Sequence, residues 1–281
     1  MVMDEGGRCR EYSIPKSSGG RRTIAVPVPS LMAVQRVIKE AIVDNISIHD
    51  AAVGFRAGYS IKSHVEAHLG ASRYIKIDIK DCFSSIRMSK IIQIFKGADF
   101  TNEMSYCLAR LATHRGVLPQ GAPTSPGLCN AVLKQLDIRL FGLCEGLNLR
   151  YSRYSDDVLI SGERIDLGVF KSSIVCVEEC ALIVNNKTRM MIDPIRLIVC
   201  GISIAGGEMK LPKNKKREIR RDAYFLLKKG AIHESQFFKD FDPFYVDRIL
   251  GRLGFWAFVE PEAEFPRKYR QFIKEQFQEF L

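Results

Sequence analysis

The stretch RYSDDVLISG, residues 153–162, places two adjacent carboxylates in a run that otherwise has the composition of a β-strand. Tyr154 and Val158 favour a half-buried pleated surface, on which Asp is among the least favoured residues. Burying an unpaired carboxylate is costly, and two neighbouring carboxylates repel each other. Asp156 and Asp157 are therefore expected to bind a divalent cation, although a lone Asp-Asp pair at a hairpin tip is more often a solvated turn.

A third carboxylate is expected from IKIDIKDCF, residues 75–83. Asp78 lies inside a predicted strand between Ile77 and Ile79, where an acidic side chain has no packing role; its plain alternative is an ion pair with a neighbouring lysine. Magnesium prefers oxygen ligands and leaves room for substrate phosphates. Two such ions can stabilise the attacking and the leaving oxygen of an in-line phosphoryl displacement. The two segments therefore predict a site for two Mg²⁺ ions formed by three carboxylates.

The balance of charge points to a polyanionic partner. The chain has 281 residues, with 42 Lys and Arg against 32 Asp and Glu, which gives a formal net charge of +10. Phosphate groups favour clustered basic residues, so nucleic acid is the first candidate, although net charge alone is weak support. Hydrophobic residues make up 46% of the chain, as in an ordinary globular protein.

Several other classes of protein are disfavoured by the sequence. No apolar run approaches the roughly 20 residues needed to cross a bilayer, and the N-terminal residues lack the apolar segment of a signal peptide. The eight cysteines are scattered without a CxxC pair. This pattern is typical of reduced, structural thiols, argues against zinc, and predicts a cytoplasmic protein with no membrane partner.

The hydrophobic pattern predicts an α+β core, because short strands occur among amphipathic helices. The strands are expected in residues 12–28 (two strands around a Ser/Gly-rich turn), 73–81, 147–161 (the hairpin that carries the paired acids) and 189–204 (a pair with a turn near Asp193).

The composition changes after Pro212, where the basic run KNKKREIRR begins a helical pattern. We therefore predict a core domain at residues 1–211 and a basic helical domain at 212–281. The aromatic residues Phe255 and Trp256 of the second domain could stack on bases, but a core position is the better prediction for both.

Seven blocks of the chain together resemble a reverse transcriptase, and in detail a bacterial retron-type one. They occur in the family's order over roughly residues 13–204, and LPQGAPTSP followed by YSDD is the most specific pair. The resemblance implies an α+β right-hand polymerase, with fingers and palm in the first domain and a short helical thumb in the second. The blocks are SGGRRTIAVPVPSLMAVQRVI, VGFRAGYSI, IKIDIKDCFSSI, LPQGAPTSPGLCN, RYSDDVLISG, NNKTRM and VCGISI.

The resemblance implies a role for each matching position of the catalytic centre. Asp78, Asp156 and Asp157 would hold the metal ions, with the carbonyl oxygen of Ile79 as a further ligand. Lys187 would donate a proton to the leaving pyrophosphate.

The same resemblance implies where the substrates bind. Phe83 would be a steric gate, since an aromatic ring under the sugar leaves no room for a 2′-hydroxyl; the plain alternative is a core side chain. The residues implied to bind the incoming deoxynucleotide are Lys16, Arg22, Asp81, Cys82, Phe83 and Gln120. Those implied to lie along the backbone of an RNA–DNA hybrid are Lys213, Lys215, Lys216, Arg217, Arg220 and Arg221.

Retron enzymes typically carry an Asn-Ala-x-x-His element, of which this chain keeps only the final residue, His68. If the chain is of the retron type, it copies a structured non-coding RNA into a short single-stranded DNA (msDNA), uses dNTPs, and takes part in anti-phage defence with a separately encoded effector protein. Two alternatives stay open. One is another defence-associated or abortive-infection reverse transcriptase, and the other is a non-catalytic RNA-binding scaffold on the same fold.

Overall fold

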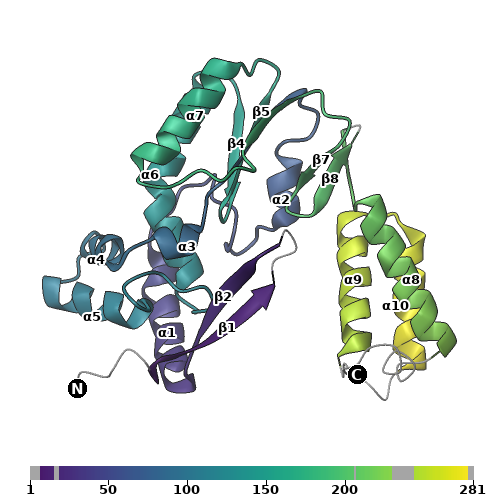
Figure 1. Cartoon of the computed structure of the whole chain (residues 1–281), viewed down its shortest axis with the longest axis horizontal. Helices are drawn as coiled ribbons and strands as arrows, with labels where there is room; N and C mark the ends of the chain where they lie inside the picture. Colours follow the sequence, from purple (N-terminus) through teal and green to yellow (C-terminus); the bar gives the residue numbers. More distant parts are fainter. Residues whose placement is uncertain (1–6, 16–18, 206, 230–243, 278–281) are drawn as a thin grey trace. The chain divides into compact units, whose positions relative to one another are not determined.

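The chain forms two compact units, Met1–Asp193 and Pro194–Leu281, each of which is described by itself (Figure 1). This division comes earlier in the chain than the boundary at 212 that composition predicts. A computed structural model of the protein describes residues 7–15, 19–205, 207–229 and 244–277.

The first unit combines a sheet, a separate hairpin and several helices. Its strands are β1 (Cys9–Pro15), β2 (Arg21–Pro27), β3 (Arg73–Asp78), β4 (Arg150–Tyr154), β5 (Asp157–Gly162) and β6 (Arg189–Ile192). Its helices are α1 (Pro29–Ala41), the 3-10 helix η2 (Val43–Asn45), α2 (Ile61–Glu66), α3 (Cys82–Ser85), α4 (Met88–Lys96), α5 (Asn102–Ala112), α6 (Ser125–Glu145) and α7 (Leu167–Glu179).

The central sheet has the strand order β4-β5-β3-β6 and is antiparallel throughout. Asp78 at the end of β3 is the register partner of Asp157 at the start of β5. The β4–β5 hairpin turns through Ser155, whose φ of 60° lies in the left-handed region. One prediction was wrong: the residues 189–192 do not form a hairpin with the strand that follows them, because β6 pairs with the edge of β3.

The hydrogen-bond partners of successive side chains along β4 show which helix covers each face of the sheet. The Tyr151 and Arg153 side chains bond to Asp137 on α6, whereas the Ser152 side chain between them bonds to His64 on α2. Successive side chains of a strand point to opposite faces, so α6 and α2 lie on opposite sides of the sheet (Figure 1).

The main core lies between the sheet and α6. Ile75 and Ile160 are register partners, as are Ile77 and Val158, and all four side chains are completely buried. They share the face of the sheet that carries Tyr151, since Tyr151 on β4 is the register partner of Ile160 on β5. Burying each aliphatic side chain of this size stabilises the fold by about 1.5–3 kcal/mol.

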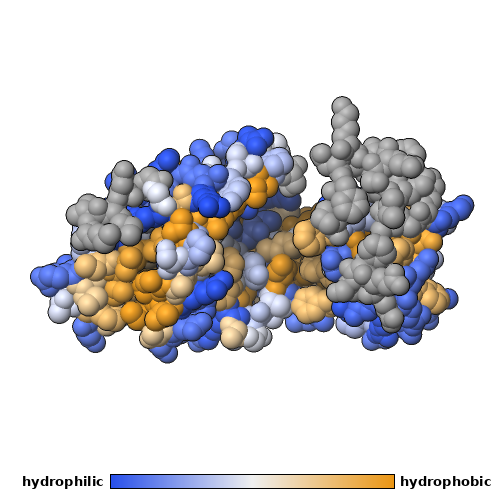
Figure 2. Space-filling view, turned by 90° about the horizontal axis from the view of Figure 1, so that it is seen from below, coloured by the Kyte–Doolittle hydropathy of each residue, from blue (hydrophilic) through white to orange (hydrophobic). Residues whose placement is uncertain are grey.

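The surface of the first unit carries exposed apolar side chains. Figure 2 shows hydrophobic residues gathered over the left part of the face seen from below, with hydrophilic residues around them. Helix α1 exposes 44% of Val34 and 64% of Val37. Single exposed apolar residues are normal on folded proteins and carry no functional conclusion.

In its described residues, the second unit is a small sheet followed by three helices. Trp256, 2% exposed, lies at the centre of its core and is stacked on Phe265; Phe255 packs against this core, so the prediction of core positions for the two neighbouring aromatics is confirmed. The elements are β7 (Leu197–Val199), β8 (Ile202–Ala205), β9 (Glu208–Lys210), α8 (Lys213–Lys229), α9 (Tyr245–Val259) and α10 (Glu264–Gln276). Among the described residues of both units, no helix is long and apolar enough to span a bilayer.

Candidate active site

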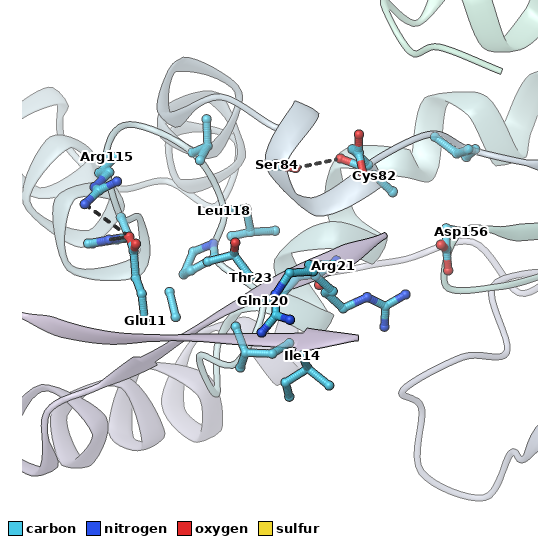
Figure 3. Close-up of a pocket in the computed structure, with 18 of the residues that line it drawn as sticks. Glu11, Ile14, Arg21, Thr23, Cys82, Ser84, Arg115, Leu118, Gln120 and Asp156 are labelled. Atoms are coloured by element: carbon cyan, nitrogen blue, oxygen red, sulfur yellow. Dashed lines mark hydrogen bonds and ion pairs between the residues drawn. The ribbon is translucent and has the colours of Figure 1, made fainter. Parts of the chain in front are cut away.

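A cleft of about 770 Å³ in the first unit brings most of the predicted site residues together (Figure 3). Its walls come from the β1–β2 hairpin, the end of β3, the start of α3, the loop before α6, the tip of the β4–β5 hairpin and the segment before β6. The predicted residues that line it are Arg22, Asp78, Ile79, Asp81, Cys82, Gln120, Asp156 and Lys187.

Backbone hydrogen bonds hold Asp78 between two neighbouring segments. The Ile79 amide donates to the carbonyl oxygen of Asp156 at 3.1 Å, which ties the end of β3 to the hairpin tip. On the other side, the Asn185 amide donates to the carbonyl oxygen of Asp78 at 2.8 Å, and the Asp78 amide donates to Thr188 Oγ1 at 3.2 Å. The two acids and the segment that carries Lys187 are thereby fixed around one edge of the cleft.

The electrostatics of this edge are unfavourable for the carboxylates alone. Burial raises the pKa of Asp78, and the charges of Asp156 and Asp157 raise it further, while Lys187 opposes them. Burial also raises the pKa of Asp156. The charge of Asp157 raises this pKa further, and the charge of Arg22 lowers it. Raised carboxyl pKa values mean that the protein alone stabilises the ionised carboxylates poorly here, chiefly because they are partly buried, and a bound cation would stabilise them.

The donor set fits magnesium by its chemistry, since carboxylate and carbonyl oxygens are the ligands that this ion prefers. The carboxylates do not converge on a ready-made site: Asp157 Oδ1 lies 3.3 Å from Lys76 Nζ. Within the described ranges, no group of three His, Cys, Asp or Glu side chains is arranged to hold a metal ion. Binding of a cation would therefore require Asp157 to exchange its lysine partner for the ion.

The loop before α6 reaches the cleft through a close backbone contact. The Ala25 amide on β2 donates to the carbonyl oxygen of Gln120 at 2.8 Å. A Cβ atom at Gly121, whose φ is 117°, would lie 2.9 Å from Ile24 Cγ2 and 3.0 Å from the Ala25 carbonyl oxygen. Only glycine allows this approach, which places Gln120 in the cleft (Figure 3).

Several residues of the cleft were not predicted from the sequence. Glu11 on β1 accepts from His114 Nε2 at 3.0 Å and pairs with Arg115 Nη2 at 3.3 Å, so these three close the end of the cleft opposite Asp156 (Figure 3). The hydrogen bond from His114 lowers the pKa of Glu11. Glu11 is far from His114 and Arg115 in the sequence, and no local sequence pattern predicts their contact. Asn185 lines the cleft as well.

Comparison with known proteins shows which family has this arrangement. A profile of the family "Reverse transcriptase (RNA-dependent DNA polymerase)" matches residues 14–202. The chain belongs to the reverse transcriptase family. It is 30% identical to the retron Ec86 reverse transcriptase of Escherichia coli, over 78% of this chain and 70% of that one. It is 38% identical to the retron Mx162 reverse transcriptase of Myxococcus xanthus, over 53% of this chain but only 35% of that one. These relatives show the bacterial retron type.

Solved structures confirm the right-hand polymerase fold of this reverse transcriptase family member. Apo telomerase from Candida tropicalis superposes with a TM-score of 0.52 at 14% identity, covering 97% of this chain and 61% of that one. Telomerase from Candida albicans, solved with a fragment of telomeric RNA, gives a TM-score of 0.51 at 12% identity and covers 96% of this chain and 54% of that one. At such identities the likeness concerns the fold alone, and the α+β right-hand prediction is confirmed.

Three of the residues predicted for this reverse transcriptase are not among those that line the cleft. Lys16 lies outside the described residues. Asp157 and Phe83, both described, are not part of the cleft lining. Phe83 is half-buried against the main core, with its ring 6.4 Å from that of Phe55 in an edge-on arrangement. The position is consistent with either prediction for Phe83, a gate or a core side chain.

The predicted hybrid-binding residues all lie on α8 in the second unit, and they differ in their surroundings. Lys216 Nζ pairs with Glu260 Oε2 at 2.6 Å, and the guanidinium of Arg220 lies 5.0 Å from the centre of the Trp256 ring. Lys213 and Arg217 are exposed. Lys216 is half-buried and ion-paired, and Arg220, although exposed, lies against the Trp256 ring, whereas Lys213 and Arg217 present their charge to solvent.

Proposed function

We propose that this protein is the RNA-directed DNA polymerase of a retron, which copies a structured non-coding RNA into short single-stranded msDNA in the cytoplasm as part of anti-phage defence. The observation that carries the proposal is the pair of cleft carboxylates, Asp78 and Asp156, with raised pKa values at the meeting point of β3 and the β4–β5 hairpin. A protein that only bound RNA would have no use for acids that repel one another at this position.

The catalytic centre would hold two Mg²⁺ ions through Asp78, Asp156, Asp157 and the carbonyl oxygen of Ile79. When bound, such ions neutralise charge on the attacking and leaving oxygens of a phosphoryl transfer. Asp157 is the register partner of Asp78 in the β3–β5 pair, and it would join the same ions by releasing Lys76.

The chain's own side chains would orient the nucleotide. Arg22 on β2 and Lys187 in the segment before β6 both line the cleft and supply positive charge, for the triphosphate and for the leaving pyrophosphate. Gln120 lies beside the incoming nucleotide, the amides of Asp81 and Cys82 bind its phosphates, and Phe83 limits the space at its sugar. Asp81, with φ of 46°, turns the chain sharply into α3 and presents the first amides of that helix to the cleft.

The template would be the cognate RNA, held along α8, and the product would be DNA linked to or paired with it. The first experiment is to purify the protein from its native host and to sequence the nucleic acid that accompanies it. A short DNA joined to a structured RNA supports a retron. RNA without DNA supports another defence-associated reverse transcriptase.

A matched pair of variants tests the catalytic assignment. Asp156→Asn with Asp157→Asn should abolish primer extension with dNTPs while the affinity for RNA stays within twofold. Asp50→Asn, whose side chain is 92% exposed in the same unit, is the control and should keep full activity. Polymerisation by the double variant would contradict the assignment, and absence of polymerisation by the wild-type protein on any primed template would favour an RNA-binding scaffold.

A further inference from the structure

An arginine lies completely buried beneath the tip of the β4–β5 hairpin. The Arg153 side chain is 0% exposed, and so is that of its partner Asp137 on α6. Its Nε and Nη2 atoms donate to the two carboxylate oxygens of Asp137, each at 2.7 Å. Tyr151 donates a third hydrogen bond to this carboxylate at 2.6 Å. A buried ion pair is weak evidence for stability, because apolar residues of similar volume often serve as well. Its presence here calls for another reason.

The remaining donor of Arg153 is directed at the hairpin turn. Nη1 donates to the carbonyl oxygen of Ser155 at 2.8 Å and to Asn130 Oδ1 at 3.0 Å. Ser155 has φ of 60°, a backbone conformation that a non-glycine residue adopts only when its surroundings hold it there. It immediately precedes Asp156. A guanidinium can hold a carboxylate with one edge and a carbonyl with another because its donors are fixed in a plane.

The same network fixes the chain segment that lies against the turn. Asn130 Nδ2 donates to the carbonyl oxygen of Gly54 at 2.7 Å. The backbone of Arg153 exchanges hydrogen bonds with this segment, since its amide donates to the Ala51 carbonyl at 2.8 Å and its carbonyl accepts from the Val53 amide at 2.9 Å. A Cβ atom at Gly54 would lie 2.7 Å from the Ser155 nitrogen, so the segment and the turn are in tight contact.

We propose that Arg153, held by Asp137 and Asn130, is a positioning residue for the polymerase reaction: it locks the Ser155 turn so that Asp156 and Asp157 stand where the reacting phosphate requires them. The inference rests on the proposed role of these two acids. Arg153 itself lies under the site and does not line the cleft. A displacement of the acids by about 1 Å can lower the rate on the order of 100-fold, so a turn held in one position favours the reaction.

The test replaces the buried network by apolar groups of similar volume. In the triple variant Arg153→Met, Asp137→Leu, Tyr151→Phe, no buried charge is left without its partner, but Asn130 Oδ1 and the Ser155 carbonyl lose their donor. The gain from the apolar replacement and this loss oppose each other, so the thermal midpoint should stay within a few degrees of that of the wild type. With the Ser155 carbonyl released, kcat for single-nucleotide addition should fall roughly 10- to 100-fold. The KM for dNTP should change by less than threefold, because the β1–β2 hairpin and the loop before α6 are untouched. Hydrogen exchange should accelerate in residues 154–157.

A control of matching chemistry is present on the same helix. Arg139 on α6 forms an ion pair with Glu179 at the surface, with side chains 47% and 55% exposed. Replacing both by Gln should leave kcat, KM and the exchange of residues 154–157 at wild-type values. If the triple variant does not fold, Asn130→Ala decides instead. It keeps the ion pair, removes the link to Gly54, and should lower kcat with a smaller change of KM.

The outcomes separate this inference from the proposed function. Wild-type kcat in a folded triple variant overturns the positioning role, as does a fall in kcat that only matches a loss of folded protein. Wild-type kcat in Asn130→Ala overturns it where the triple variant cannot be used. Residual polymerisation by the Asp156→Asn, Asp157→Asn protein overturns the proposed function itself, whatever the behaviour of Arg153.

Discussion

Lowering the pH from 7 to 5 should destabilise the first unit through two buried histidines on the α2 side of the sheet. His64 Nδ1 lies 2.7 Å from Ser152 Oγ, His68 Nε2 lies 2.8 Å from the same oxygen, and His68 Nδ1 lies 2.7 Å from Ser161 Oγ. Both side chains are completely buried. Burial lowers the pKa of His64 to about 4 and that of His68 well below 6.5.

The sign follows from the two protonation states. In the unfolded chain a histidine takes up its proton near pH 6.5, whereas the folded protein resists protonation of His64 until about pH 4. The unfolded state therefore binds more protons between these values, so the stability present above pH 6.5 is lost as the pH falls toward 4. For His64 alone the loss between pH 7 and pH 5 is about 2 kcal/mol. His68 acts in the same direction, while Asp78 and Asp156, with raised pKa values, act in the opposite one.

The assay compares thermal midpoints at pH 7 and pH 5 for the wild type and His64→Gln. Glutamine can still bond to the Ser152 hydroxyl but does not titrate, and the other groups stay in both proteins. The wild-type midpoint should therefore fall by about 4–8 °C more than that of the variant over this range. Equal falls in the two proteins would refute the reasoning, because they would show that His64 does not couple its proton to folding.

Four further variants probe the buried ion pair, the nucleotide site and α8. Asp137→Ala leaves the charge of Arg153 buried without its carboxylate and should destabilise the protein by about 3–5 kcal/mol in chemical denaturation. Phe83→Val should raise the incorporation of ribonucleotides relative to deoxynucleotides by about 10- to 100-fold in primer extension, if the ring excludes a 2′-hydroxyl. Lys216→Ala should lower the stability of the second unit by about 1–2 kcal/mol, because Glu260 loses a charged partner. Lys213→Ala should leave stability unchanged but weaken RNA binding and reduce its salt dependence by about one phosphate contact.

The parts of the fold that the sequence predicts are those encoded locally. Two strands around a turn appear as β1 and β2, and the strand before Asp81 ends at Asp78 because the chain turns there into α3. The gathering of Asp78 and Asp156 in one cleft was also predictable, since an acid inside an apolar strand has no packing purpose. The pairing of β6 with β3 could not be predicted, because β3 lies far upstream in the sequence and no local pattern in β6 identifies it as the partner.

The supporting networks of the site could not be predicted from the sequence. Arg153 lies in a strand beside the paired acids, where hydropathy gives no reason to expect complete burial. Its partner Asp137 belongs to a helix whose other buried positions are mostly apolar. His64 and His68 likewise meet Ser152 only because α2 packs on β4, which no local spacing reveals. Burial of a polar side chain depends on which distant partner satisfies it.

These two networks together determine the register that the carboxylates need. On β4, Arg153 bonds to α6 on one face of the sheet, and Ser152 bonds on the other face to His64 of α2 and to His68 just after that helix. A slip of one residue would turn every side chain of the strand to the opposite face. Arg153 would then be buried on the α2 side without Asp137, at a cost of several kcal/mol. The polar groups on the two faces therefore exclude the slipped pairing, and with it any β4–β5 hairpin in which Asp157 does not stand opposite Tyr154.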